Sequence, residues 1–183
     1  MFIENKMLFL LKIQIMKLTT KRTELNLIQK EDFQEIIDSF REKDAVKYIK
    51  HIQGLSNNEY LDFLEQKRLL SKNGQLFYWT VREKETQNYI GTMGVMPYLG
   101  SDSAFHIGFR ISKDFQEKGF ATELGKVVID FVKTELKHQL IFGLIMEGNI
   151  ASQTLLKKLG FQFLKSDFNT DYQIQLETYR LDF

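Results

Sequence analysis

The sequence predicts an α+β domain in which helices cover a mixed β-sheet. Apolar and polar residues alternate over 172–181, as in a half-buried strand, and apolar residues recur every three or four positions over 33–40, as in an amphipathic helix. A strand-like run at 104–111 leads through a short loop into a helical run at 121–136, and another strand-like run follows at 140–146. This order predicts one parallel, right-handed crossover.

Length and composition fit one globular domain. Of the 183 residues, 43% are hydrophobic and 27% are charged, close to ordinary globular values. The 25 basic and 24 acidic residues leave a net charge of +1, so nothing indicates a nucleic-acid partner. The chain has no cysteine and three scattered histidines, which excludes a disulfide framework and a thiol nucleophile and argues against a metal site.

The N-terminal segment is apolar but short. Residues 7–15 are interrupted by Lys12, cannot span a bilayer, and lack the small-residue cleavage site of a secretory signal. The segment reads either as an extra strand or as an extension ahead of a natural start at Met16, and we favour the extension. We therefore expect an extension over 1–16, a single domain over 17–183, a cytoplasmic location and no membrane partner.

Before the crossover, the pattern predicts two helices among four strands. A strand at 24–29 precedes the helix at 33–40, and a second helix begins at the cap residues 56–59 and ends before Asn73-Gly74. The runs at 76–82, 89–96 and 104–111 are separated by short polar turns and predict an antiparallel meander.

After the crossover, a helix beginning at residues 149–152 and ending before Gly160 precedes two final strands, at 161–164 and 172–181.

The loop at 116–123 is the first candidate site. Gly119 and Ala121 leave their backbone N–H groups open at the positive end of the following helix, which suits a phosphate or pyrophosphate. The loop alone fits a plain strand-to-helix turn equally well.

Two motifs resemble a known family. Gln116-x-x-Gly119-x-Ala121 resembles the acyl-CoA-binding signature of the GNAT N-acetyltransferases, although Gln116 replaces the commoner arginine. Asn149-x-Ala151-Ser152, followed by Leu-Leu-Lys-Lys-Leu-Gly-Phe, resembles the second half of that core. The sequences of these two motifs, together with residues 20–25 near the start of the domain, are most similar to the ribosomal-protein-type (RimJ/RimL-like) branch. The resemblance covers roughly residues 20–181.

The resemblance implies an α/β/α sandwich around a mixed, largely antiparallel, twisted sheet of about seven strands with about four helices. It also implies a V-shaped split after the fourth strand, here 105–111, in which acetyl-CoA would lie. Asn149 and Ser152 read either as ordinary helix caps or as cofactor contacts. The implied cofactor-binding residues are Phe109, Arg110, Ile111, Gln116, Lys118, Gly119, Phe120, Ala121, Thr122, Asn149 and Ser152.

By resemblance, the chain would transfer the acetyl group of acetyl-CoA to a primary amine by direct attack in a ternary complex. His106 stands where that branch often has a glutamate base, and a reference pKa of about 6.5 suits a base near neutrality. A strand histidine without a catalytic role is the alternative. Asn149 is the second catalytic candidate, and the usual tyrosine acid is replaced by Leu156. The missing residues keep open a catalytically weak acyl-CoA-binding or sensor module.

The acceptor is expected among aromatic residues. Tyr48, Trp79 and Tyr172 are the candidate substrate-binding residues, since aromatic faces hold amines by cation–π contact. Aromatics at this spacing are also common in cores. The sequence does not choose between a protein N-terminus and a small-molecule amine, or between a monomer and a homodimer.

Overall fold

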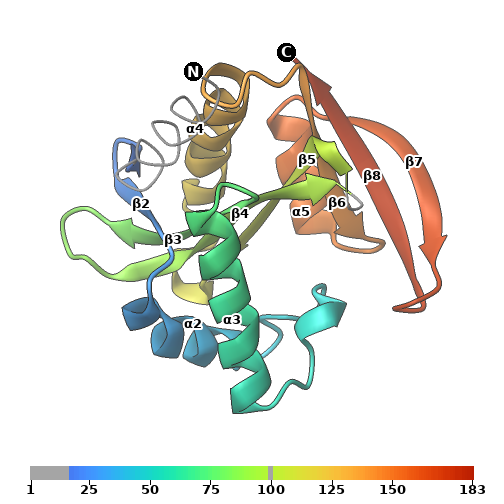
Figure 1. Cartoon of the computed structure of the whole chain (residues 1–183). Coiled ribbons are helices and arrows are strands. Elements are labelled where there is room, and N and C mark those ends of the chain that lie inside the picture. The colour runs from blue at the N-terminus through green and yellow to red at the C-terminus, as the bar shows by residue number, and fades with distance from the viewer. Residues whose placement is uncertain (1–16, 99–100) are drawn as a thin grey trace.

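The computed structural model describes residues 17–98 and 101–183 (Figure 1). The predicted N-terminal extension therefore lies outside the described residues. The strands are β1 (Leu18–Thr19), β2 (Thr23–Leu27), β3 (Phe77–Glu83), β4 (Tyr89–Tyr98), β5 (Ser101–Ile111), β6 (Leu140–Met146), β7 (Gln162–Asn169) and β8 (Ile174–Asp182). The helices are α2 (Phe33–Phe40), α3 (Asn57–Lys72), α4 (Phe120–Thr134) and α5 (Ile150–Lys158), with 3-10 turns η1 (Lys30–Asp32), η2 (Lys50–Ile52) and η3 (Lys113–Phe115).

All the strands described form one mixed sheet in the order β1-β2-β3-β4-β5-β6-β8-β7, and only the β5–β6 pair is parallel. The predicted α+β class and the crossover are confirmed. The sheet has eight strands instead of about seven, because the two-residue β1 pairs with β2 and is too short to show a periodic pattern. Pro97 lies inside β4, beside a register shift that tolerates a residue without an N–H.

The helices cover both faces of the sheet. Helices α2 and α3 pack on one face around a core that includes Ile36, Leu64 and Tyr78, and they lie together below the sheet in Figure 1. Helices α4 and α5 pack on the other face, where Leu124 and Phe131 meet β-strand residues. Within the described ranges, no helix is both long and apolar enough to cross a membrane.

The sheet splits between β5 and β6. Parallel pairing joins them only at His106–Phe142 and Ile107–Gly143. Beyond these pairs, β5 continues against β4 as far as Ile111, and β6 continues against β8 as far as Met146. The two halves of the sheet therefore separate at the C-terminal ends of β5 and β6, which is the predicted V-shaped split.

We predict that Gly91→Ala destabilises the fold by about 3 kcal/mol. A Cβ on Gly91 would lie 2.0 Å from the carbonyl oxygen of Arg110 on β5, and that backbone atom cannot move without breaking the β4–β5 ladder. Gly94→Ala is the matched control on the same strand, since its Cβ would meet only side-chain atoms, at 3.2 Å or more. Urea unfolding measures the free energy of unfolding of both variants, and an equal decrease for the two would contradict the prediction.

Candidate functional site

The loop between β5 and α4 presents a row of backbone donors. We call residues 116–122 the anion loop. Gly119 caps α4 with a left-handed φ of 82°, and Glu117 has a φ of 60°. Within the described part of the chain, the backbone N–H groups of residues 117–122 donate no hydrogen bond. Successive free N–H groups at the positive end of a helix form a concave site for an anion.

The anion loop borders a cavity of about 820 Å³ at the split in the sheet. The end of β5 and the anion loop form one wall, α5 with its cap residue forms the second, and the segment after α2 forms the third. The lining residues are Glu42, Lys43, Asp44, Ala45, Tyr48, Ile49, Phe109, Arg110, Ile111, Lys113, Phe115, Gln116, Glu117, Gly119, Phe120, Ala121, Thr122, Asn149, Ile150, Ala151, Ser152, Thr154, Leu155 and Lys158.

The structure brings the sequence-predicted cofactor residues together around this cavity, apart from Lys118. The Lys118 ammonium lies 5.7 Å from the centre of the Phe115 ring, and its carbonyl oxygen accepts a hydrogen bond from Arg22. Gln116 uses its side-chain amide to donate to the carbonyl of Ile111 at 2.8 Å, which fixes the turn out of β5.

Asn149 caps α5. Its Oδ1 atom accepts from the backbone N–H of Ser152 at 3.2 Å, so the capping interpretation is confirmed. The amide nitrogen of Asn149 donates no hydrogen bond to any described residue, and both residues line the cavity. Because one side-chain amide has both an acceptor and donors, the cap leaves the donors available to a ligand.

His106 has a defined tautomer and a low pKa. It lies on β5 opposite Met96, with Nδ1 3.2 Å from the carbonyl oxygen of Pro97. A carbonyl only accepts, so Nδ1 carries the proton and Nε2 is an acceptor. Burial lowers the pKa of His106 to about 4, and the nearby charges of Lys67 and His51 also lower it. The hydrogen bond to Pro97 acts in the opposite direction and raises the pKa, but its effect is smaller than that of burial. His106 is not among the residues that line the cavity.

The three aromatic acceptor candidates have different environments. Tyr48 lines the cavity, and its hydroxyl donates to the carbonyl of Gly148 at 3.1 Å. Tyr172 is exposed, with its ring 6.4 Å from that of His51. The prediction for Trp79 is wrong: it is 1% exposed and packs against core aromatics, because its position on β3 faces α4.

The buried side chain of Arg110, which the sequence analysis gave only as an implied cofactor-binding residue, organises one wall of the cavity. The Arg110 guanidinium donates to the Ser39 hydroxyl at 2.9 Å and to the Ser39 carbonyl, and it lies 5.4 Å from the Phe40 ring centre. The Nε atom of Arg110 is buried and has no hydrogen-bond partner. These contacts fix the C-terminal end of α2, from which the lining segment 42–49 continues.

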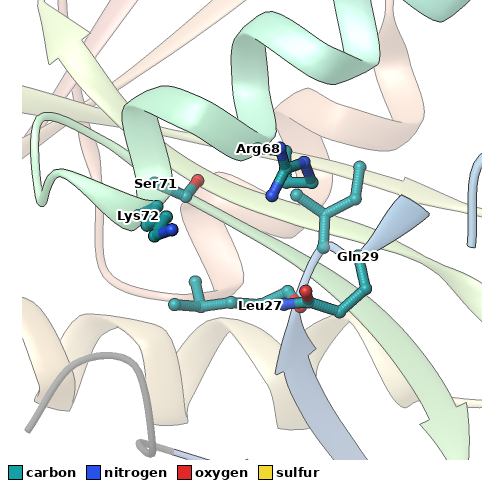
Figure 2. A pocket seen from close by; sticks show the side chains of 6 residues that line it. Leu27, Gln29, Arg68, Ser71 and Lys72 are labelled. Carbon is teal, nitrogen blue, oxygen red and sulfur yellow. The ribbon is translucent and has the colours of Figure 1, made fainter. Parts of the chain in front are cut away.

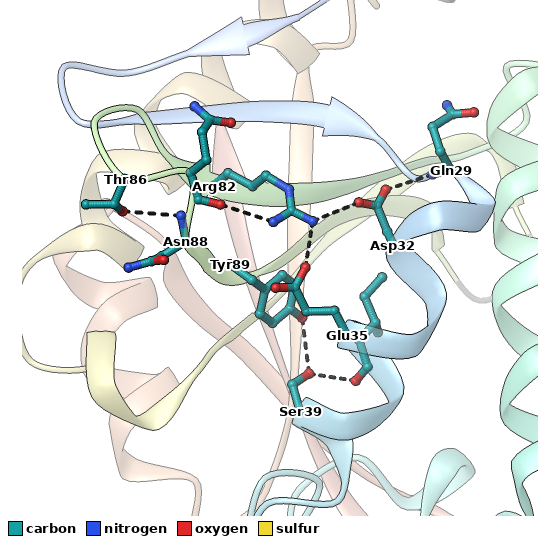
Figure 3. A network of polar contacts seen from close by, with 10 residues as sticks. Gln29, Asp32, Glu35, Ser39, Arg82, Thr86, Asn88 and Tyr89 are labelled. Atoms are coloured by element: carbon teal, nitrogen blue, oxygen red, sulfur yellow. Dashed lines mark hydrogen bonds and ion pairs between the residues drawn. The ribbon is translucent and has the colours of Figure 1, made fainter.

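A second polar network holds the rest of α2 to the sheet (Figure 3). Arg82 on β3 pairs with Asp32 and with Glu35 on α2, at 3.2 and 2.6 Å. The Ser39 hydroxyl, which Arg110 also contacts, lies 3.2 Å from the Tyr89 hydroxyl on β4. The sequence showed no sign of this network, since each pair joins residues 47 or more positions apart.

A smaller cavity of about 250 Å³ lies between the end of β2 and α3 (Figure 2). Its lining includes Leu27, Gln29, Arg68 and Lys72. The Arg68 guanidinium donates two hydrogen bonds to the Glu65 carboxylate, at 2.7 and 2.8 Å, so its charge is already paired. The larger cavity, with its free N–H groups, is therefore the candidate functional site.

Comparison with known proteins identifies the family. The model of the acetyltransferase (GNAT) domain matches residues 22–162, which is most of the chain. The chain belongs to the GNAT family of N-acetyltransferases. It is 27% identical over 156 residues to the uncharacterized N-acetyltransferase p20 of Bacillus licheniformis, covering 85% of this chain and 86% of that protein. The family is one of enzymes, so this GNAT protein is an N-acetyltransferase.

Solved structures share the GNAT fold. The ribosomal L7/L12 α-N-protein acetyltransferase RimL, in complex with coenzyme A, superposes with a TM-score of 0.78 at 13% identity, covering 91% of this chain and 98% of that one. An acetyltransferase from Salmonella typhimurium that modifies the N-terminal serine of ribosomal protein L7/L12 superposes with a TM-score of 0.78 at 13% identity. The match covers 90% of this chain and 96% of that one. At this identity the likeness shows the fold alone.

We predict that His106 titrates near pH 4 in the folded protein, because burial disfavours the imidazolium. The unfolded chain binds this proton at about pH 6.5, so His106 makes no difference to stability above that pH and destabilises the fold as pH falls from 6.5 towards 4. The free energy of unfolding should fall by up to about 3 kcal/mol over this pH range. His106→Gln should flatten the acid side of the stability profile measured by urea unfolding. An NMR titration of His106 near pH 6.5 would contradict this account.

Proposed function

We propose that this GNAT enzyme transfers the acetyl group of acetyl-CoA to a primary amine by direct attack in a ternary complex. The proposal depends chiefly on the row of free N–H groups in the anion loop, which borders the cavity at the positive end of α4. The cavity volume lies within the usual range for small-molecule sites, roughly 300–1,000 Å³. The shared fold with a protein solved in complex with coenzyme A supports the same assignment.

The residues at the cavity fit the chemical parts of the donor. The N–H groups of residues 117–122 suit the pyrophosphate, since they lack other acceptors. The backbone of Phe109, Arg110 and Ile111 lies at the split, where β5 has no partner on its β6 side, and it suits the amides of the pantetheine arm. The orphaned Nε–H of Arg110 adds a buried donor next to the same space.

The chemistry requires positioning more than a covalent relay. Acetyl-CoA supplies an activated acyl carbonyl, and the protein must orient a neutral amine towards it. Alignment of two reactants in one site can remove about 7–11 kcal/mol from a barrier. We assign the free amide donors of Asn149 to the donor arm or its carbonyl, because they open on the cavity from the start of α5.

For His106 we propose a role as proton acceptor, directly or through water. Its Nε2 lone pair is fixed by the Nδ1–H bond to Pro97, and the ring stays neutral throughout the physiological range. A base of such low pKa is a weak one, so the amine must reach the site already largely deprotonated.

The acceptor is a protein N-terminus or a small-molecule amine. The cavity wall at Tyr48 and the exposed ring of Tyr172 are the aromatic surfaces that we assign to it. The ribosomal proteins named for the structural neighbours make an N-terminal amine the first acceptor to test.

Acetyl-CoA turnover over a panel of N-terminal peptides and small amines tests the function, with free CoA measured as a thiol. Ala121→Glu should raise the KM for acetyl-CoA by about tenfold or more, because a carboxylate at the start of α4 repels the pyrophosphate. Thr134→Glu adds the same charge at the far, exposed end of α4 and should leave the KM unchanged. Tight CoA binding without turnover of any amine would favour a CoA-binding module over an enzyme.

Two substitutions separate the cap of α5 from the ligand role of Asn149. Asn149→Ser keeps an oxygen that caps the N–H of Ser152, whereas Asn149→Ala removes it and should cost about 1 kcal/mol of stability. Both remove the amide donors, so both should lower kcat/KM for acetyl-CoA by a similar factor, about tenfold. Full activity of Asn149→Ser would contradict a role for the amide in turnover.

A further inference from the structure

Arg22, in the turn between β1 and β2, reaches the anion loop from the N-terminal end of the domain. Its Nε donates to Glu123 Oε2 at 2.8 Å, and its backbone N–H donates to Glu123 Oε1 at 3.0 Å. Its Nη1 donates to the carbonyl of Lys118 at 3.1 Å. One residue therefore holds both ends of the segment 118–123, across about a hundred positions of sequence.

The same guanidinium covers the first residue of α4. Its central carbon lies 3.9 Å from the centre of the Phe120 ring, close enough for a cation–π contact. Its Nη2 atom is 3.7 Å from the place where a Cβ on Gly119 would lie. Arg22 therefore contacts residues on both sides of the Gly119 cap: Lys118 before it and Phe120 and Glu123 after it.

Glu123 creates an electrostatic problem at this place. Its carboxylate lies in the first turn of α4, where the helix dipole favours negative charge, and so it competes with any anionic ligand for the same positive end. Burial acts to raise the pKa of the Glu123 carboxyl, but hydrogen bonds from Thr20 and Arg22 outweigh it. The pKa of Glu123 is therefore below its ordinary value, and the group is ionised at neutral pH. The positive charge of Arg22 offsets this carboxylate.

We propose that Arg22 is a positioning residue for the pyrophosphate of the acyl donor: it fixes the anion loop in its binding shape and neutralises Glu123. The inference rests on the proposed function, since it assumes that the anion loop holds the donor. An isolated surface ion pair contributes little, typically below about 1 kcal/mol. Arg22 differs because four contacts fix its geometry. Its backbone N–H and its Nε donate to the Glu123 carboxylate, its Nη1 donates to the Lys118 carbonyl, and its guanidinium packs on the Phe120 ring.

Calorimetric binding of CoA to the full chain tests the proposal. Arg22→Ala should raise the Kd by about tenfold. Arg180→Ala is the matched control: Arg180 also pairs with a carboxylate, Asp182, and its side chain is exposed to a similar degree, 42% against 40%. The control should bind CoA like the wild type. An unchanged Kd for Arg22→Ala would overturn the proposal.

A double-mutant cycle separates positioning through Glu123 from a purely electrostatic effect of Arg22 on phosphate. Glu123→Gln should strengthen CoA binding in the Arg22→Ala background, because it removes an uncompensated carboxylate. In the wild type it should not strengthen binding, because it also removes the acceptor that holds Arg22 on the anion loop. If Arg22 instead acted on phosphate only through its own charge, the effect of Glu123→Gln would be the same in both backgrounds. That additive result would overturn the positioning role.

Two further measurements distinguish a local role from general damage. With acetyl-pantetheine, a donor that lacks the pyrophosphate, Arg22→Ala should turn over like the wild type, and an equal loss with both donors would overturn the proposal. Amide hydrogen exchange of Glu123, whose N–H donates to the carbonyl of Gly119 at 3.2 Å, should accelerate in the free protein in Arg22→Ala and not in Arg180→Ala. This exchange is independent of CoA, so unchanged protection refutes the positioning role, whereas failure of the wild type to bind CoA refutes the proposed function.

Discussion

The short parallel pairing between β5 and β6 is the constraint on which the site depends. Two residue pairs hold the strands together at His106 and Ile107, and beyond them each strand follows its outer neighbour. The split leaves the inner backbone edge at the end of β5 without a partner, next to a cavity. A sheet paired along its full length would satisfy that edge internally, and a buried backbone without partners is costly. The fold therefore leaves backbone groups at the split that a bound ligand can satisfy.

Electrostatics at the split follow from the same geometry. The crossover from β5 to β6 contains helix α4, which begins at the open end of the split with its positive end towards the cavity. Gly119 allows the left-handed turn that exposes the N–H groups of the anion loop. Helix α5 begins on the opposite side, at Asn149, so polar donors face the cavity from both halves of the sheet.

The parts of the site that the sequence predicted are those set by local spacing. Gly119 and Ala121 at the start of a helical run, and Asn149 three residues before Ser152, have their roles fixed within one turn of backbone. The helices, the crossover and every strand except the two-residue β1 were predicted for the same reason, since their periodicity is local.

The rest depends on packing between distant segments. The strand run 76–82 is aromatic and apolar on both faces, so its pattern does not separate a core position from a binding surface, and packing against Phe131 of α4 buries Trp79. The cavity wall at 42–45 has no motif, and its position follows from the contacts of Arg110 with Ser39. The one sequence signal for that wall was a charge inside an apolar strand, at Arg110, whose partner 71 positions away no pattern could name.

The central claim is that the split and the anion loop together bind the acyl donor. A crystal structure of the protein with CoA tests it most directly. The account predicts the pyrophosphate within hydrogen-bond distance, about 2.7–3.2 Å, of the backbone nitrogens of residues 117–122, with the pantetheine arm between β5 and β6. CoA bound elsewhere, with the anion loop facing solvent, would contradict it.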